Sequence, residues 1–395
     1  MKISLACNNP WGAGGQGNFL NRASQGLREL GELTVYCAGY GQPTADFPVH
    51  ALGFSVWSQR ILSTPIVRRR RDLATLLADI YFDRQVSKRI QSESCDLLIG
   101  VAGQSYLSFK AAKAKGTKVW MYCLNTYLPF MQAQIRQEVD LLKDAAVATM
   151  HPKMLDRFAK ECALADFILV NSQVAKQTFI DAGFAAEKLA AIAPVVDTVR
   201  FHPTPKKDED SVFRVLYVGT IDPRKGVHYL IPAFLKAQIP NSELLLVGGY
   251  STRAMRILIE DTLSQHANIK QEIWDFKQKD PTEIFSRCSV LVMPSVEDGF
   301  GVVALEGMAC GLPAIVTSYC GAADIIQEGV NGFVVPPRDV EAIAQKLGYL
   351  SEQESMRLEM GKAARNMAMQ HTQVRYNQDI RQIFSNLGLI RGGMT

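Results

Sequence analysis

Residues 294–317 read PSVEDGFGVVALEGMACGLPAIVT and decide the fold class of the chain. The apolar run before them ends in an acidic, glycine-bearing turn at 297–301, which is typical of a strand that enters a loop. The apolar segment 302–310 predicts a short helix, because Gly311 supplies a C-terminal cap and a proline follows. The β-branched run 314–317 predicts another strand. This unit predicts an open α/β sheet, in which ligands bind at the carboxyl ends of strands.

Glu306 is the anomalous residue of this unit, because it falls in the second turn of an otherwise apolar helix. A buried charge without partners is costly, and the two hydroxyls of a ribose would supply hydrogen bonds to the carboxylate. The start of the same helix, at 299–303, offers unpaired N–H groups to a phosphate. The alternative is an exposed glutamate on a surface helix. Asp298, at the same helix entrance, favours a ligand site.

The stretch resembles the motif of the family 4 glycosyltransferases, which are retaining enzymes of the GT-B fold. That motif has two glutamates separated by seven residues around a Gly-Phe-Gly turn, followed by Glu-x-Met-Ala-x-Gly-x-Pro. Glu306 matches the second acid, whereas Asp298 occupies the first position, with the neighbouring Glu297 as an alternative. The resemblance implies that Glu306 binds the ribose of a sugar nucleotide. It implies that Asp298 binds the donor sugar together with the turn formed by Gly299, Phe300, Gly301 and Val302.

The loop 220–226 carries the other half of the expected donor site. It follows a predicted strand, 213–219, and resembles the Gly-Arg … Lys-Gly turn with which the family grips the donor diphosphate. Lys225 matches the lysine, but Thr220 replaces the arginine, so a second positive charge would come from Arg224. A cation is needed where the leaving diphosphate gains charge, since the sequence has no metal motif. The alternative for a lone lysine at a helix start is solvent exposure.

Gly12, Gly14 and Gly17 match the G-x-G-x-x-G pattern of dinucleotide-binding folds. The next predicted strand lacks the acid that would hold a ribose, which argues against a nicotinamide site. The resemblance implies instead a glycine loop in which the backbone N–H groups of Gly14 and Gly15 approach the donor phosphate or the acceptor. A purely structural tight turn is the alternative. We expect a helix to follow from about residue 18.

Family members also place a histidine near the reacting centre, after the strand that we predict at 118–123. Here the next residues, 124–127, read LNTY. Neither Asn125 nor Tyr127 is assigned the role of that histidine, and His151 does not align with it.

The length of 395 residues suffices for two domains, and alternating strands and helices predict parallel sheets. The polar, proline-bearing segment 204–211 predicts a linker. We therefore expect a GT-B protein with two Rossmann-like domains that face a central cleft. The expected parts are an N-terminal acceptor-binding domain at 1–204, a C-terminal sugar-nucleotide-binding domain at 205–372 and, at 373–395, a helix that crosses back to the first domain.

The composition, with 47% apolar and 21% charged residues, fits a soluble globular protein and excludes a disordered or fibrous one. No apolar stretch is long enough to span a membrane, and the apolar N-terminus is too short for a signal peptide, so we expect a cytoplasmic protein. The eight cysteines lack metal-ligand spacing and are expected to be reduced core residues. No metal site is expected.

The first 204 residues carry a net charge of +6, whereas the rest carry −2. Much of the excess comes from four consecutive arginines, Arg68 to Arg71, beside apolar residues of a predicted helix. Such a basic amphipathic face would suit an anionic membrane surface or a charged acceptor, which would place the protein at the inner membrane face. A solvated face is the alternative.

The resemblance thus implies a retaining, metal-independent glycosyltransferase of the hexosyltransferase type, with Lys225, Asp298 and Glu306 as catalytic residues. It would move a sugar from a nucleotide-sugar donor to a glycan, lipid or small-molecule acceptor. No further cofactor and no nucleic-acid partner are expected. The alternative is a non-catalytic sugar-nucleotide-binding or scaffold protein on the same fold, because the histidine is missing and Asp298 and Thr220 depart from the motif.

Overall fold

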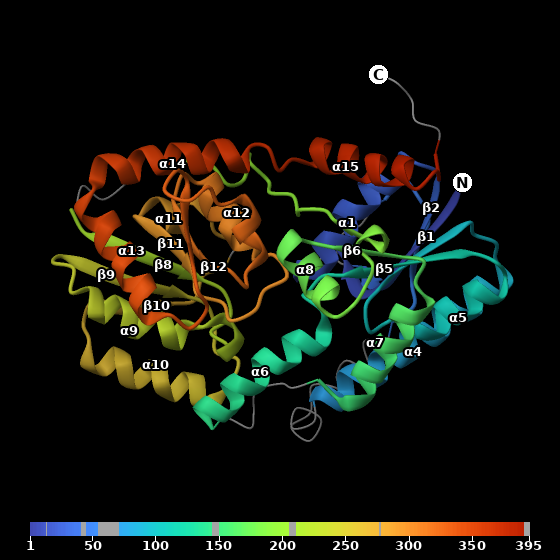
Figure 1. The fold of residues 1–395 in the computed structure, drawn as a ribbon, viewed down its shortest axis with the longest axis horizontal. Coiled ribbons are helices and arrows are strands. Elements are labelled where there is room, and N and C mark those ends of the chain that lie inside the picture. Colours follow the sequence, from blue (N-terminus) through green and yellow to red (C-terminus); the bar gives the residue numbers. More distant parts are fainter. Residues whose placement is uncertain are drawn as a thin grey trace.

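The computed structural model of the protein describes residues 1–12, 14–40, 45–53, 71–143, 150–204, 211–275 and 278–390. Two parallel β-sheets form two α/β units that lie side by side (Figure 1). The protein therefore has the predicted architecture of two Rossmann-like domains. Most of the predicted linker and of the arginine run lies outside the described residues, since 205–210 and 68–70 are not among them.

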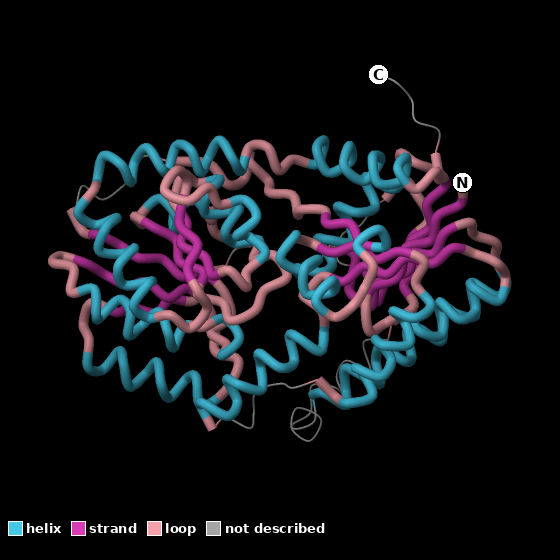
Figure 2. The backbone as a smooth tube through the Cα atoms, viewed as in Figure 1, coloured by secondary structure: helices cyan, strands magenta, loops and turns pink. Residues whose placement is uncertain are grey.

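The first sheet has seven parallel strands in the order β3-β2-β1-β4-β5-β6-β7. Figure 2 shows the strands of both sheets in magenta. The sequences of the first sheet's strands are rich in apolar residues, because helices cover both faces of a parallel sheet. In chain order they are β1 (Lys2–Trp11), β2 (Glu32–Tyr40), β3 (Val49–Ala51), β4 (Leu97–Val101), β5 (Lys118–Cys123), β6 (Phe167–Val170) and β7 (Leu189–Ala191).

Side chains of the first sheet alternate between two apolar clusters, as the two-residue repeat of a strand requires. On β1, Ile3 and Leu5 belong to one cluster and Ala6 to the other. The first cluster is covered by α1 (Gly14–Arg28) and by α15 (Gln373–Asn386), far apart in sequence. The opposite face is covered by α4 (Arg71–Ser92), α5 (Tyr106–Ala114), α6 (Leu128–Leu142), α7 (Pro152–Leu164) and α8 (Gln173–Asp181).

The second sheet has six parallel strands in the order β10-β9-β8-β11-β12-β13. They are β8 (Phe213–Val218), β9 (Ser242–Val247), β10 (Ile269–Glu272), β11 (Val290–Met293), β12 (Ala314–Thr317) and β13 (Gly332–Val335). One face packs against α11 (Thr282–Ser286), α12 (Val302–Ala309) and α14 (Glu354–Ala368). The other packs against α9 (Val227–Ala237), α10 (Arg253–Gln265) and α13 (Val340–Glu352).

Residues 290–317 fold as their local pattern predicts: β11, a loop, α12 and β12 follow one another. Gly311 follows the last turn of α12 with a φ of +84°, a conformation that a glycine adopts without strain. The parallel pairing of β11 with β8 on one side and β12 on the other places this unit in the middle of the sheet.

The helix after β1 differs from the prediction, because α1 begins at Gly14 rather than near residue 18. Gly14 and Gly15 therefore form its first turn instead of a loop. A β-carbon on Gly17 would lie 2.1 Å from the carbonyl oxygen of Pro10, so the helix packs directly against the end of the strand.

The C-terminal helices join the two units. Figure 1 shows α14 over the second sheet and α15 over the first, beside α1. Phe384 of α15 is fully buried, and its ring centroid lies 4.6 Å from that of Trp120 on β5. None of the described helices is both long enough and apolar enough to cross a membrane.

Candidate active site

The loops after β8 and β11 meet at one edge of the second sheet. The two strands pair in parallel, so their carboxyl ends lie at the same edge. Gly226, with a φ of +71°, lets the loops touch: a β-carbon there would lie 1.9 Å from the carbonyl oxygen of Pro294. The N–H of Val296 also donates to the carbonyl oxygen of Arg224 at 2.9 Å. Only a glycine at 226 permits this approach.

Two ion pairs connect these loops. The η2 turn (Pro223–Lys225) presents two consecutive cations, and the β11–α12 loop presents two consecutive acids. Arg224 donates from Nη1 to Oε2 of Glu297 at 2.9 Å and to the carbonyl oxygen of the same residue at 3.2 Å. Lys225 pairs through Nζ with Oδ2 of Asp298. The predicted Lys225, Arg224 and Asp298 are thus brought together, with Glu297 as an additional member.

The opposite charges of these two pairs favour the ionised forms of their partners. Burial acts to raise the pKa of Asp298, but the nearby Lys225 and Arg224 outweigh it and hold the pKa below its usual value. Burial acts to lower the pKa of Arg224, yet Glu297 and Asp298 outweigh it and raise the pKa further. Both groups therefore stay ionised at neutral pH, and the edge of the sheet carries fixed charges of both signs.

The turn between these acids and α12 is tightly packed. Gly301, the N-cap of α12, has a φ of +78°, and a β-carbon there would lie 2.7 Å from Sγ of Cys320. Phe300 is buried, and its carbonyl oxygen accepts from Cys320 Sγ at 3.2 Å and from the N–H of Ala322 at 2.6 Å. Val302, the first residue of α12, is 39% exposed. The first residue of α12 is therefore exposed, whereas the turn before it is buried.

Glu306 has an environment of its own. It lies in the second turn of α12 and is half-buried, and no described side chain hydrogen-bonds its carboxylate. Burial raises its pKa to about 7, an effect that Arg200 partly offsets. A carboxylate held short of partners in this way is suited to accept hydrogen bonds from a ligand such as a diol.

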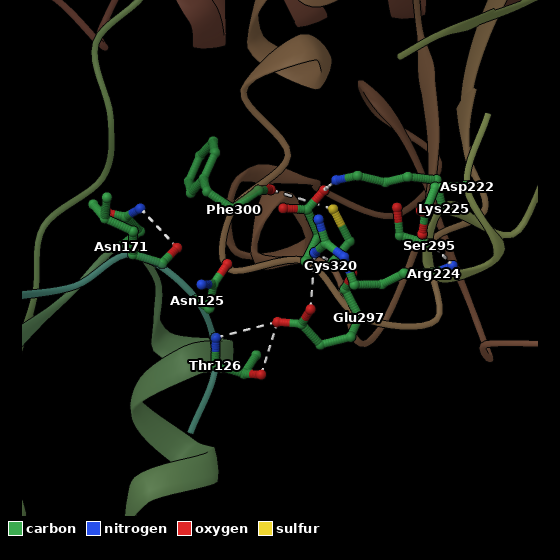
Figure 3. A network of polar contacts seen from close by, with 12 residues as sticks. Asn125, Thr126, Asn171, Asp222, Arg224, Lys225, Ser295, Glu297, Phe300 and Cys320 are labelled. Carbon is green, nitrogen blue, oxygen red and sulfur yellow. Dashed lines mark hydrogen bonds and ion pairs between the residues drawn. The ribbon is translucent and has the colours of Figure 1, made fainter. Parts of the chain in front are cut away.

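The first domain closes one side of this site. Thr126, after β5, donates to Oε1 of Glu297 from its hydroxyl at 2.8 Å and from its N–H at 3.2 Å (Figure 3). Ser172 Oγ donates to the carbonyl oxygen of Gly299 at 2.8 Å. A β-carbon on Gly299 would lie 2.1 Å from the carbonyl oxygen of Leu124. The segment 124–127, where the family histidine is missing, thus reaches the site through Thr126.

A second contact between the domains lies on α6. Glu138 is buried and accepts from His228 Nε2 at 2.7 Å, from the Tyr229 hydroxyl at 3.0 Å and from Arg338 Nε at 2.7 Å. Arg338 also donates to Oε1 of Gln134 at 2.9 Å. These bonds join the first domain to α9 and to the loop before α13.

The sequence singled out Arg224, Lys225 and Asp298, which the structure brings together, but not every residue that contacts them. Glu297 entered only as an alternative to Asp298, and Thr126 was missed, although its position next to the absent histidine was a signal. Gly15 is exposed, and a β-carbon there would meet nothing within 4 Å. Within the described parts of the chain, no three His, Cys, Asp or Glu side chains are grouped as metal ligands would be.

Comparison with known sequences agrees with this geometry. The profile described as "Glycosyl transferases group 1" matches residues 200–367, and the profile described as "Glycosyltransferase Family 4" matches residues 13–200. The chain belongs to the family 4 glycosyltransferases of the GT-B fold. The two profiles meet at residue 200: one covers the first sheet from β2 to β7, and the other covers the whole of the second sheet.

Individual relatives point the same way. The chain is 28% identical over 228 residues to a D-inositol 3-phosphate glycosyltransferase of Corynebacterium urealyticum. The matched region covers 53% of this chain and 54% of that one. The chain spans about half the length of the curated relatives it matches.

Solved structures show the same fold over the whole chain. A sucrose-phosphate synthase from Thermosynechococcus elongatus superposes with a TM-score of 0.71 at 20% identity, covering 98% of this chain and 99% of that one. The Anabaena protein HepE, in a complex with UDP-glucose, superposes with a TM-score of 0.67 at 20% identity, covering 99% of this chain and 100% of that one.

Proposed function

We propose that this family 4 glycosyltransferase transfers a sugar, with retention at the anomeric carbon, from a nucleotide-sugar donor to a hydroxyl of a glycan, lipid or small-molecule acceptor. The observation that carries the proposal is the pairing of the loops after β8 and β11, which puts Arg224 and Lys225 at the carboxyl edge of the sheet beside the loop that leads into α12. A donor diphosphate fits such an edge.

In this scheme the bond between the anomeric carbon and the diphosphate oxygen breaks, and a bond from that carbon to the acceptor oxygen forms. The leaving diphosphate gains negative charge, which Lys225 and Arg224 stabilise. Asp298 and the backbone from Gly299 to Gly301 contact the sugar, and Glu306 accepts hydrogen bonds from the ribose. The acceptor lies on the first domain. Neither a metal ion nor a further cofactor is part of the scheme.

A thermal-shift screen over UDP-, GDP- and ADP-glucose tests donor binding. UDP-glucose comes first, because HepE, which has the same fold, binds it. A ligand at 100 times its dissociation constant adds about 2.7 kcal/mol of stability. Hydrolysis of the selected sugar nucleotide would then separate an enzyme from a binding protein, and NMR of the released sugar reports the anomer. A protein that binds no sugar nucleotide, or binds one without any turnover, contradicts the proposal.

We also propose that Arg68 to Arg71 meet an anionic acceptor or membrane surface. Each basic residue near an anionic bilayer contributes about 1 kcal/mol, and salt screens the attraction within about 8 Å. Replacing the four arginines by serine should reduce sedimentation with anionic liposomes at low salt and leave donor binding intact. Equal partitioning of wild type and variant into anionic and neutral liposomes would show a solvated face instead.

A further inference from the structure

Glu297 is a fully buried acid at the point where the two domains meet. Its Oε1 accepts both donors of Thr126, from the first domain, and its Oε2 accepts Nη1 of Arg224, from the second. Figure 3 shows the carboxylate between these two residues. Glu297 therefore connects a residue of the first domain directly to a cation of the proposed diphosphate site.

A buried carboxylate of this kind is not explained by stability alone. Removing a charge from water is costly, and replacing a buried ion pair by apolar residues is often neutral or stabilising. Among the described residues, both hydrogen bonds of the Arg224 guanidinium leave from Nη1 and end on Glu297. Nε and Nη2 of Arg224 have no hydrogen-bond partner among these residues, and the two bonds from Nη1 hold the guanidinium against Glu297. The carboxylate therefore orients the guanidinium.

The orientation depends on the first domain. Thr126 is fully buried and supplies two of the three donors to the Glu297 carboxylate. Domains of one chain commonly move relative to each other. When they separate, the Glu297 carboxylate loses both Thr126 donors and is held by Arg224 alone, so the geometry of the guanidinium changes.

We propose that Glu297 is a positioning residue. Through its bonds to Thr126 it couples the contact between the domains to the orientation of Arg224 toward the donor diphosphate. The inference rests on the proposed function. Glu297 touches neither reacting atom. Its effect therefore falls on turnover rather than on the affinity for nucleotide, because removing an acid next to a diphosphate does not weaken binding of the anion.

Two substitutions at Thr126 test the first-domain side. Thr126→Val removes the hydroxyl bond at nearly constant shape, whereas Thr126→Ser keeps it. We expect Thr126→Val to lower kcat about tenfold and to leave the Kd for the free nucleoside diphosphate within twofold, since misplaced catalytic groups cost rate. Thr126→Ser should restore kcat. Gln134→Ala, which removes a bond between the domains that involves neither Glu297 nor Arg224, is the matched control and should retain wild-type kcat.

Glu297→Gln tests the other side. It keeps the shape of the side chain and removes its charge, so kcat should fall at least tenfold while the Kd for the nucleoside diphosphate stays the same or decreases. The double variant Thr126→Val/Glu297→Gln should lose no more than Glu297→Gln alone, because both changes interrupt one connection. If the losses in kcat of the two single variants multiply in the double variant, the two changes act independently. If a variant loses affinity for the nucleoside diphosphate as much as it loses kcat, the residue has a merely structural role. Either result overturns the inference.

The wild type is measured first, with the sugar nucleotide that the screen over UDP-, GDP- and ADP-glucose selects. If it neither transfers nor hydrolyses that compound, the proposed function and this inference fall together. If the wild type turns over the donor and both Thr126→Val and Glu297→Gln match it in kcat, only the inference is wrong.

Discussion

Lys225 and Asp298 form an ion pair between the loops that follow β8 and β11. The pair lies beside that of Arg224 with Glu297, so two consecutive cations face two consecutive acids. Asp298 is only 8% exposed, and the lysine keeps it ionised against the effect of burial. The lysine in turn is held in one place. A donor diphosphate would therefore meet a cation that is already oriented.

Replacing Lys225 by alanine should depress turnover by about 10²-fold, as removal of one transition-state donor does. The substitution removes the charge that faces the leaving diphosphate. Steady-state kinetics with the selected sugar nucleotide measure the effect. Lys236→Ala, which breaks the exposed ion pair with Glu341, is the matched control and should keep wild-type turnover. A Lys225→Ala variant as active as the control would assign the role to Arg224.

The ribose assignment of Glu306 is tested with a ligand that lacks one hydroxyl. Glu306→Gln should weaken binding of the nucleoside diphosphate by about 1–3 kcal/mol, because a charged acceptor of hydrogen bonds is lost. The 2′-deoxy form should bind the wild type more weakly, yet bind the variant as well as the ribose form does. Calorimetry with both ligands on both proteins gives the coupling. No coupling would mean that Glu306 and the hydroxyl do not meet.

Glu306 also predicts a pH dependence of stability. Its pKa is raised by burial to about 7, above the 4.5 of an unperturbed glutamate. Between these values the folded state binds more protons than the unfolded state, so the stability contributed by this group falls as pH rises from about 4.5 to about 7. Relative to wild type, Glu306→Gln should gain at most about 3 kcal/mol between pH 4.5 and pH 8. Urea unfolding of both proteins measures the difference, and a constant difference across this range would contradict the raised pKa.

Local signals explain why much of the fold was predictable. Gly311 and nearby prolines mark the ends of β11, α12 and β12. Each of these elements is a short apolar run with clear boundaries in the sequence. The start of α1 was not predictable in this way. Gly14 and Gly15 have the composition of a loop, and the close contact of Gly17 with Pro10, which accompanies the early start of the helix, has no local signal in the sequence.

The site was predictable where its residues belong to one motif. Lys225, Asp298 and Glu306 each lie in a recognisable pattern, so the sequence could name them. Thr126 and Glu297 are 171 residues apart, and nothing local to either specifies the other. Their contact follows from the way the two domains pack, and no periodicity along the chain encodes that packing.

Gly299 offers a steric test of this packing between the domains. A β-carbon there would lie 2.1 Å from the carbonyl oxygen of Leu124 and 2.7 Å from Cα of Asn125, both backbone atoms of the first domain. Neither atom belongs to a flexible side chain, so Gly299→Ala must move the loop or the domain. We expect a larger radius of gyration in small-angle scattering and lower turnover, with nucleoside diphosphate binding retained by the second domain.

Gly348→Ala is the control for Gly299→Ala, because a β-carbon at 348 would meet nothing within 4 Å. It lies inside α13, where alanine is favoured over glycine by about 1 kcal/mol, so this variant should be at least as stable as wild type and fully active. Gly299→Ala should differ from it in both scattering and turnover. If the two variants scatter alike and turn over the donor alike, the first domain does not press on Gly299 in solution, and the contact of Thr126 with Glu297 loses its support.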